Sequence, residues 1–159
     1  MLTLSLEPLT REAFAPFGEL IEIDGSEQFE INSGYTTRVH DLISIQLEGA
    51  DARPQLSFFL GRPRPLEIRM LERHPLGSQA FYPVDNKNWI VAVSTEPKAT
   101  CIRAFLATGR QGVNYYKNIW HHPLLVFEPQ QFVIIDRGGK GKNCEEIFFD
   151  TDSVVCIKI

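Results

Sequence analysis

The feature of this sequence that most constrains its fold is a succession of short apolar or alternating segments, each about as long as one β-strand. Turn residues separate these segments, for example Asp24-Gly25, Gly61 and Gly138-Gly139. Many short strands at close spacing predict an all-β fold, an antiparallel sandwich or barrel, because closure removes exposed sheet edges. The expected strands cover residues 20–23, 42–47, 56–60, 66–71, 89–93, 101–106, 124–127, 132–135 and 154–159.

One short helix is expected near the start of the chain. Thr10 can cap the segment "REAFAPFGEL", and Pro16 should end or bend the helix. Later, in "PLEIRML", Leu66, Ile68 and Met70 alternate with other residues. This period of two predicts a strand that turns these three side chains toward the core.

Composition excludes several classes of protein. Of the 159 residues, 43% are apolar and 23% are charged, as in ordinary globular domains. A net charge of −4 without a basic block argues against nucleic acid or a membrane surface as partner. Three cysteines without a CxxC pair argue against a disulfide framework, and the start of the chain lacks a signal-peptide pattern. We therefore expect one domain, residues 1–159, that acts in the cytoplasm.

The histidines are the main candidates for chemistry. His74 and His122 each precede a proline, which favours extended backbone at both positions. In an extended segment, His121 and His122 point to opposite faces, so at most one of them enters a barrel lumen. Its partner must come from a remote segment, and Glu72-Arg73-His74 with Gln79 is the best candidate. The ordinary alternative is that each histidine is a hydrogen-bonded, half-buried residue.

Other motifs offer less. In "GYTTRVHDL", Arg38 and His40 share one face of a strand and form a plausible pair for an anion and a proton. Nucleotide-binding and nucleophile-elbow motifs are missing from the sequence. Cys144 lies beside acidic residues, which disfavour its thiolate. Asp136, at the end of an apolar segment, is a weaker candidate for orienting a site residue.

Four ordered motifs resemble the ureidoglycolate lyase family of allantoin catabolism. They are "INSGYTTRVHDL", "LERHPLGSQAFYP", "GVNYYKNIWHHPLL" and "FVIIDRGG". The resemblance implies a cupin-like antiparallel β-barrel, a double-stranded β-helix, that forms homodimers and cleaves ureidoglycolate to glyoxylate and urea. The chain departs from the family pattern at Tyr116, where histidine is common, and at Asn118, where glycine is common. A positive φ explains the second difference, since asparagine tolerates it.

The resemblance and the chemistry of the substrate together suggest roles. Cleavage needs a base, an acid and a cation for the substrate carboxylate, and histidine suits proton transfer near neutral pH. We expect His74, His121 and Lys117 to be catalytic. The expected substrate-binding residues are Asn32, Arg38, His40, Arg73, Gln79, Arg103, Asn114 and Trp120.

A metal is the most open question. Metal-binding cupins supply an H-x-H pair, a glutamate and a later histidine, whereas the first segment here offers only His74. Glu72 or Gln79 would have to complete a site with His74 and His121. The resemblance suggests a divalent metal such as nickel, and acid–base chemistry without a metal is the alternative. Other functions left open are a non-catalytic cupin domain that binds a small carboxylate, an epimerase, a metal-dependent oxygenase and a structural module.

Overall fold

The structure is a computed structural model that describes residues 2–159, and it consists almost entirely of β-strands. The strands before the body of the fold are β1 (Leu2–Ser5), β2 (Glu7–Pro8), β3 (Gly18–Ile21), β4 (Gln28–Ile31) and β5 (Thr36–Val39). Those of the body are β6 (Arg53–Gly61), β7 (Glu67–Ile68), β8 (Met70–Arg73), β9 (Gln79–Pro83), β10 (Trp89–Ser94), β11 (Arg103–Ala107), β12 (Gly112–Tyr115), β13 (Trp120–His121), β14 (Leu125–Val126), β15 (Gln130–Gly138), β16 (Glu145–Phe148) and β17 (Val155–Lys158).

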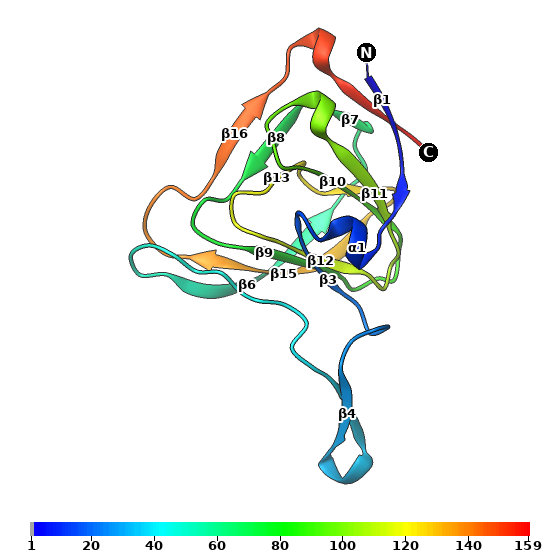
Figure 1. Cartoon of the computed structure of the whole chain (residues 1–159), viewed down its shortest axis with the longest axis vertical. Coiled ribbons are helices and arrows are strands. Elements are labelled where there is room, and N and C mark those ends of the chain that lie inside the picture. The colour runs from blue at the N-terminus through cyan, green and yellow to red at the C-terminus, as the bar shows by residue number, and fades with distance from the viewer. Residues whose placement is uncertain (1) are drawn as a thin grey trace.

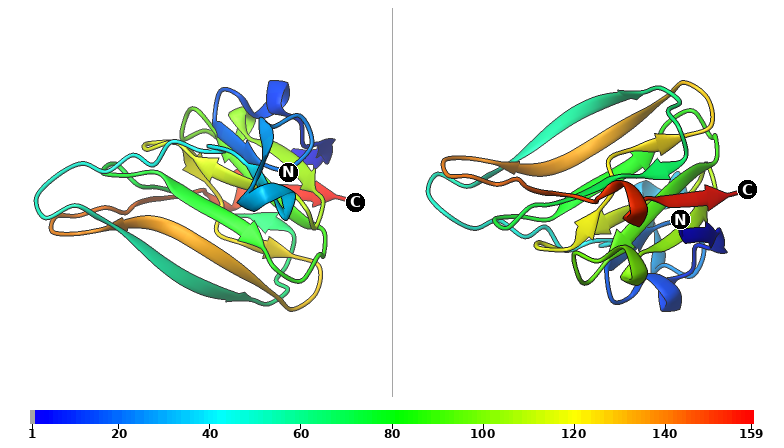
Figure 2. Two further views of the ribbon diagram at one scale, coloured as in Figure 1. Left: turned by 90° about the horizontal axis from the view of Figure 1, so that it is seen from below. Right: turned by 90° about the horizontal axis from the view of Figure 1, so that it is seen from above.

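Two large sheets face each other across the core (Figures 1 and 2). One has the order β3-β12-β9-β15-β6, and the other has the order β16-β8-β13-β10-β11-β2, with β14 also paired to β10. The chain passes repeatedly between them, as in β8 to β9 to β10 and in β11 to β12 to β13. Such alternation is typical of the two-sheet jelly rolls that include the cupins. The predicted all-β, cupin-like fold is confirmed.

The space between the sheets is filled by aromatic and branched side chains. Phe81, Trp89 and Phe132 lie within one buried cluster, and Phe132 makes an edge-to-face contact with Trp89 at 4.9 Å between ring centroids. A second cluster, which includes Ile68 and Leu71, lies on the outer side of the β8–β10 sheet, under β17. The site strands β8 and β13 therefore have a packed layer behind them, which holds their backbones in place.

The expected helix is present as α1 (Arg11–Phe14). Its N-cap is Thr10, whose hydroxyl oxygen accepts a hydrogen bond from the Ala13 N–H at 3.2 Å. The helix ends before Pro16, as a proline inside it would require. The other helical elements are three 3₁₀ turns: η1 (Asn32–Gly34), η2 (Ala99–Cys101) and η3 (Thr151–Ser153). Within residues 2–159, no helix has the length and apolar character needed to cross a bilayer.

A two-stranded arm, formed by β4, β5 and η1, projects away from the two sheets (Figure 1). Its residues are mostly exposed, including Tyr35, which is 92% exposed. The turn at its tip needs left-handed backbone, with φ of 53° at Asn32 and 59° at Ser33. Asn32 tolerates this conformation because its side chain bonds locally, here to the Thr36 hydroxyl at 3.2 Å.

Two strand predictions need correction. Residues 42–47 form no regular strand beyond an isolated bridge between Leu47 and Gly77. Side chains satisfy part of their backbone instead, since the Ser44 N–H donates to Glu19 and the Gln46 N–H donates to Ser78. The predicted strand over 66–71 is broken at Arg69, because β7 pairs with β17 whereas β8 pairs with β16 and β13.

Candidate functional site

Strand pairing brings together two residues that are far apart in the sequence. In the antiparallel pair of β13 with β8, His121 lies directly opposite Glu72. Residues opposite each other in such a pair project from the same face of the sheet, so the imidazole and the carboxylate are neighbours. His74 follows Glu72 by two residues and therefore shares that face. Asn118, in left-handed backbone at φ 66°, donates its N–H to the His74 carbonyl at 3.0 Å and fixes this segment.

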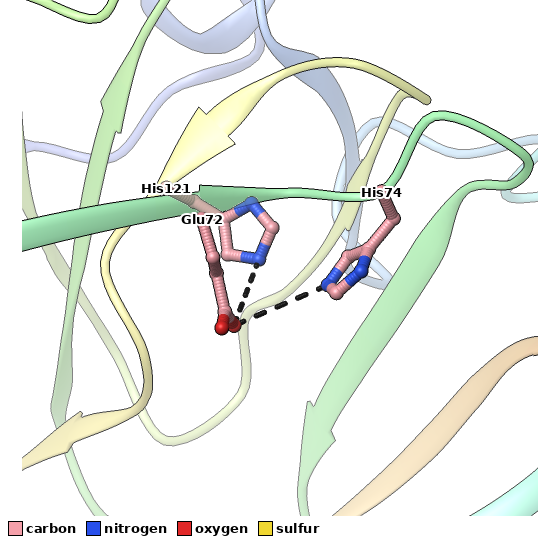
Figure 3. A group of neighbouring side chains, drawn as sticks. All are labelled: Glu72, His74 and His121. Carbon is pink, nitrogen blue, oxygen red and sulfur yellow. Dashed lines mark ion pairs between the residues drawn. The ribbon is translucent and has the colours of Figure 1, made fainter. Parts of the chain in front are cut away.

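Both imidazole rings point toward the Glu72 carboxylate (Figure 3). The Nε2 atom of His121 lies 3.5 Å from Glu72 Oε1, and the Nε2 atom of His74 lies 4.0 Å from the same oxygen. The two rings are 5.1 Å apart between centroids. His121 is almost fully buried, whereas Glu72 and His74 are partly accessible. His74 and His121, which the sequence analysis paired, thus lie side by side. We call Glu72, His74 and His121 the Glu72 cluster.

The hydrogen bonds of the two rings assign their tautomers. His74 Nδ1 lies 2.8 Å from the Asn143 carbonyl oxygen, and His121 Nδ1 lies 3.0 Å from the Ile119 carbonyl oxygen. A carbonyl oxygen can only accept, so each Nδ1 carries the proton. In the neutral rings both Nε2 lone pairs then face the carboxylate, and neither Nε2 has a hydrogen-bond partner.

This arrangement fits a divalent cation. The three ligand atoms lie within 4.8 Å of one another, and three electron-pair donors that converge without a proton between them favour a shared positive charge. Histidine ligands of metals commonly donate their other ring N–H to a carbonyl group, as both do here. A set of two imidazoles and one carboxylate suits zinc, nickel, iron and other transition metals.

Burial and charge set the protonation of the cluster. Burial lowers the pKa of His74 below its ordinary value, and the nearby His121 lowers it further. Burial acts to raise the pKa of Glu72, but the nearby imidazole rings, above all that of His121, outweigh this effect, so that the pKa is lowered. The expected state near neutral pH is therefore a carboxylate facing a neutral His74.

Tyr115 and Gln79 form part of the cluster's surroundings. The Tyr115 ring stacks on His121 with centroids 4.3 Å apart and planes 9° apart. Burial, with the charge of Glu72, raises the pKa of Tyr115, so its phenol stays neutral. Gln79 donates from Nε2 to Asp136 at 3.1 Å, while its Oε1 is buried without a hydrogen-bond partner. Asp136 thus orients the Gln79 amide so that its carbonyl oxygen has free acceptor capacity.

His122 does not join the cluster. It is buried, and its Nδ1 lies 2.7 Å from the Pro123 carbonyl oxygen. Burial lowers the pKa of His122 to about 4, so the ring is neutral near pH 7. His122 is thus a buried, hydrogen-bonded residue, close to the ordinary alternative given for each histidine. Cys144 also lies near Glu72, and burial together with Glu72 and Glu146 raises the pKa of its thiol.

The cations expected to bind substrate are engaged elsewhere. Arg73 pairs with Glu145 at 2.7 Å and lies over the Trp120 ring at 4.6 Å, which places Trp120 behind the sheet and not in the cluster. Arg103 pairs with Glu7 at 2.6 Å. Lys117 pairs with Glu48 in an exposed position, outside the cluster. Substrate or catalytic roles for these residues stay untested predictions, and their ion pairs give them no support.

The remaining candidates also lie apart from the cluster. Asn114 is buried and donates to Glu19 at 3.2 Å and to the Ser44 carbonyl oxygen at 3.1 Å. Arg38 and His40 flank Phe29 on the projecting arm, which agrees with their predicted shared face. Asn32 lies at the tip of the same arm. The predicted substrate contacts of these residues stay untested.

A cavity of about 490 Å³ reaches the cluster. Its lining includes Glu72, Phe59, Phe81, Leu124, Arg62 and Arg64. This size suits a small ligand. A slightly larger cavity of about 540 Å³, lined by Glu22 and Arg110 among others, does not include Glu72, His74 or His121 in its lining. The cavity at Glu72 is the better candidate for binding substrate, because it alone of these two has a residue of the cluster in its lining.

Sequence reasoning missed the stacking role of Tyr115, the carbonyl of Asn143 and the two arginines of the cavity. Contacts of Tyr115 and Asn143 depend on long-range packing and leave no local signal. The two arginines do have a local signal in the sequence, because "GRPRP" places two cations on a proline-stiffened loop that precedes Glu72.

Comparison with known proteins identifies the family. The family model described as ureidoglycolate lyase matches residues 1–156. A ureidoglycolate lyase of Azotobacter vinelandii is 49% identical over 158 residues, covering 96% of this chain and 95% of that protein. One from Burkholderia mallei is 52% identical over 151 residues, covering 92% and 89%.

Among solved structures, a dTDP-4-dehydrorhamnose 3,5-epimerase from Sulfolobus tokodaii matches with a TM-score of 0.40 at 11% identity, over 82% of this chain and 81% of that one. That likeness is too weak to add to the fold assignment. The family model and the two relatives, by contrast, span nearly the whole chain, and the predicted resemblance is confirmed: the chain belongs to the ureidoglycolate lyase family.

Proposed function

We propose that this protein cleaves ureidoglycolate into glyoxylate and urea at the Glu72 cluster. Full-length similarity to ureidoglycolate lyases supports the reaction. The observation that carries the choice of site is the convergence of His74 and His121 on the Glu72 carboxylate, with both Nε2 atoms buried and unpaired. Titratable groups of this kind, gathered beside a cavity, are typical of active sites.

The reaction is a pair of proton transfers around one bond cleavage. The substrate hydroxyl gives up its proton, its oxygen forms the glyoxylate carbonyl, and the carbon–nitrogen bond breaks. The leaving urea nitrogen takes up a proton, so atoms and charge balance. Groups that accept and donate protons near neutral pH are needed within hydrogen-bond reach of both atoms. In our proposal, His74 and His121 perform these transfers, and Glu72 stabilises the positive charge that forms on them.

Gln79 is proposed to bind the ureido group. Its carbonyl oxygen is free to accept an N–H, and Asp136 keeps the amide from rotating. A fixed acceptor selects a ligand that presents a donor at that point, since a buried acceptor without a partner costs about 1–3 kcal/mol.

Alternatively, Glu72, His74 and His121 would hold a divalent metal. Ligation through Nε2 would then replace proton transfer by the two rings, because each Nδ1 already faces a carbonyl oxygen. Such an ion, when bound, supplies Lewis-acid polarisation of a substrate oxygen. We keep nickel as the candidate ion that the family resemblance suggests. With a metal in place, Tyr115 would continue to hold the His121 ring by stacking, and the Asn143 and Ile119 carbonyls would continue to fix both tautomers.

An assay of both products tests the proposed reaction. Purified protein is mixed with ureidoglycolate, and glyoxylate and urea are measured in the same samples. We expect both to appear in equal amounts, well above the spontaneous rate. Glyoxylate accompanied by ammonia in place of urea would indicate hydrolysis of the ureido group. Release at the spontaneous rate would contradict enzyme function and favour the alternative of a binding domain.

Metal binding gives a separate prediction. We expect calorimetric titration of metal-free protein with Ni²⁺ to show one ion bound per chain. Glu72→Gln removes the charged ligand and should weaken binding about tenfold or more. Glu67→Gln is the matched control, because Glu67 pairs with Arg69 on the surface. Equal affinity in all three proteins would show that the ion binds elsewhere.

We also propose a homodimer formed through β6. This strand lies at the edge of its sheet and exposes three apolar side chains along one face: Leu56, Phe58 and Leu60, at 64, 59 and 60%. Apolar edges of this kind are normally covered by a partner. Sedimentation should give about twice the 18.1 kDa chain mass. Leu56→Glu should shift the protein toward monomer and Ile159→Glu should not, whereas a wild-type monomer would contradict the proposal.

A further inference from the structure

The substrate carboxylate needs a positive charge at the Glu72 cluster. A substrate that enters the cavity brings its anion toward the Glu72 carboxylate, and two negative charges at close range repel each other. A buried or half-buried anion is tolerated when a cation pairs with it through hydrogen bonds. Where no metal ion supplies this charge, a cationic side chain facing the cavity is needed for the proposed reaction.

The cations considered from the sequence do not meet this requirement. Arg73, Arg103 and Lys117 each form an ion pair with a glutamate of their own. A cation already neutralised by a carboxylate attracts a second anion only weakly. Arg38 lies in β5 of the projecting arm, 5.9 Å from the Phe29 ring centroid.

Two arginines of the loop between β6 and β7 do meet it. Arg62 and Arg64 line the same cavity as Glu72, and within residues 2–159 neither forms a hydrogen bond or an ion pair with another side chain. They alternate with Pro63 and Pro65. The proline rings restrict the backbone of this loop and so reduce the range of positions from which the two arginine side chains extend.

Arg64 is the better placed of the two. Pro63 and Pro65 flank it on both sides, so its backbone is more restricted than that of Arg62. Arg64 is also nearer than Arg62 in sequence to Glu72. A guanidinium presents a fork of N–H donors that matches a carboxylate in two parallel hydrogen bonds.

We infer that Arg64, assisted by Arg62, binds the substrate carboxylate at the cavity that reaches Glu72. This inference rests on the proposed lyase function and adds a residue that determines substrate binding. The two arginines hold the carboxylate end of the substrate, so that the carbon whose bond to nitrogen breaks lies toward the cluster.

Steady-state kinetics of Arg64→Gln test the inference. We expect KM for ureidoglycolate to rise about 10- to 100-fold, as the loss of a charge-assisted hydrogen-bond pair implies, with kcat within about twofold of wild type. Glyoxylate, the product that keeps the carboxylate, should inhibit the variant more weakly by the same factor. Inhibition by urea, which has no carboxylate, should not change. Arg62→Gln should show a smaller rise in KM.

Arg69→Gln is the matched control. Arg69 belongs to the same stretch of chain but pairs with Glu67 on the surface at 2.7 Å. The KM of the Arg69→Gln protein should therefore equal that of wild type. An equal rise in Arg69→Gln would show a general effect of net charge and overturn the inference. An unchanged KM and unchanged glyoxylate inhibition in Arg64→Gln would overturn it as well. Failure of the wild-type protein to release glyoxylate would instead refute the proposed function, and calorimetry with glyoxylate then still reports whether Arg64 binds a carboxylate.

Discussion

Replacing His121 with alanine is expected to lower kcat/KM for ureidoglycolate by about 10²- to 10⁴-fold, the usual contribution of one positioned proton-transfer group. His121 is 1% exposed, lies 3.5 Å from Glu72 and has an unpaired Nε2. Its loss removes a proton-transfer group from the cluster or, with a metal bound, one of the three ligand atoms. His74→Ala should give a loss of similar size, because its ring faces the same carboxylate oxygen. Glyoxylate release under steady-state conditions measures both.

His40→Ala is the control for these variants. His40 is a histidine of the projecting arm, beside Phe29, and we expect its replacement to change kcat/KM by less than about twofold. Circular dichroism and thermal unfolding should show that all three variants keep the fold. A folded His121→Ala protein with wild-type activity would show that the cluster is not the active site. A large loss in His40→Ala would place the arm in the site, as the sequence alone suggested.

The largest effect on stability is expected for Phe132→Ala. Phe132 is fully buried between the sheets and contacts both Trp89, at 4.9 Å between ring centroids, and Phe81, at 6.4 Å. Truncation to alanine removes the buried apolar surface and leaves a cavity, which together cost about 3–5 kcal/mol. This is a large fraction of the free energy of unfolding of an ordinary domain. Chemical denaturation should show a lower midpoint with a similar slope.

Phe148→Ala is the matched comparison. Phe148 is 72% exposed at the end of β16, so its truncation should change the free energy of unfolding by no more than about 0.5 kcal/mol. Equal destabilisation by the two substitutions would mean that Phe132 does not lie in a packed core.

Local pattern predicted part of the site well. The alternation of His121 with His122 allowed only one of these two histidines to face the cavity, and the period of two also puts Glu72 and His74 on one face. Both statements need only the geometry of an extended chain. That His121 lies opposite Glu72 depends on strand register between segments almost fifty residues apart, which the sequence of either segment does not fix.

Charged residues were harder to place because their partners are chosen by tertiary packing. Arg73 and Arg103 read as free cations in the sequence, yet each meets a glutamate from a distant segment. The same limit applies to the expected strand over 42–47, whose backbone groups bond to Glu19 and Ser78 side chains in place of a neighbouring strand. That the chain forms one domain and acts in the cytoplasm stays a prediction from composition.

The most direct test of the central claim is the rate of glyoxylate release by folded Glu72→Gln protein at saturating substrate and metal. The substitution keeps the shape of the side chain and removes the charge that both histidine rings face. If the Glu72 cluster cleaves ureidoglycolate, we predict a rate at least about 100-fold below that of wild type. Release at the wild-type rate from the folded variant would contradict the claim that this cluster is the active site.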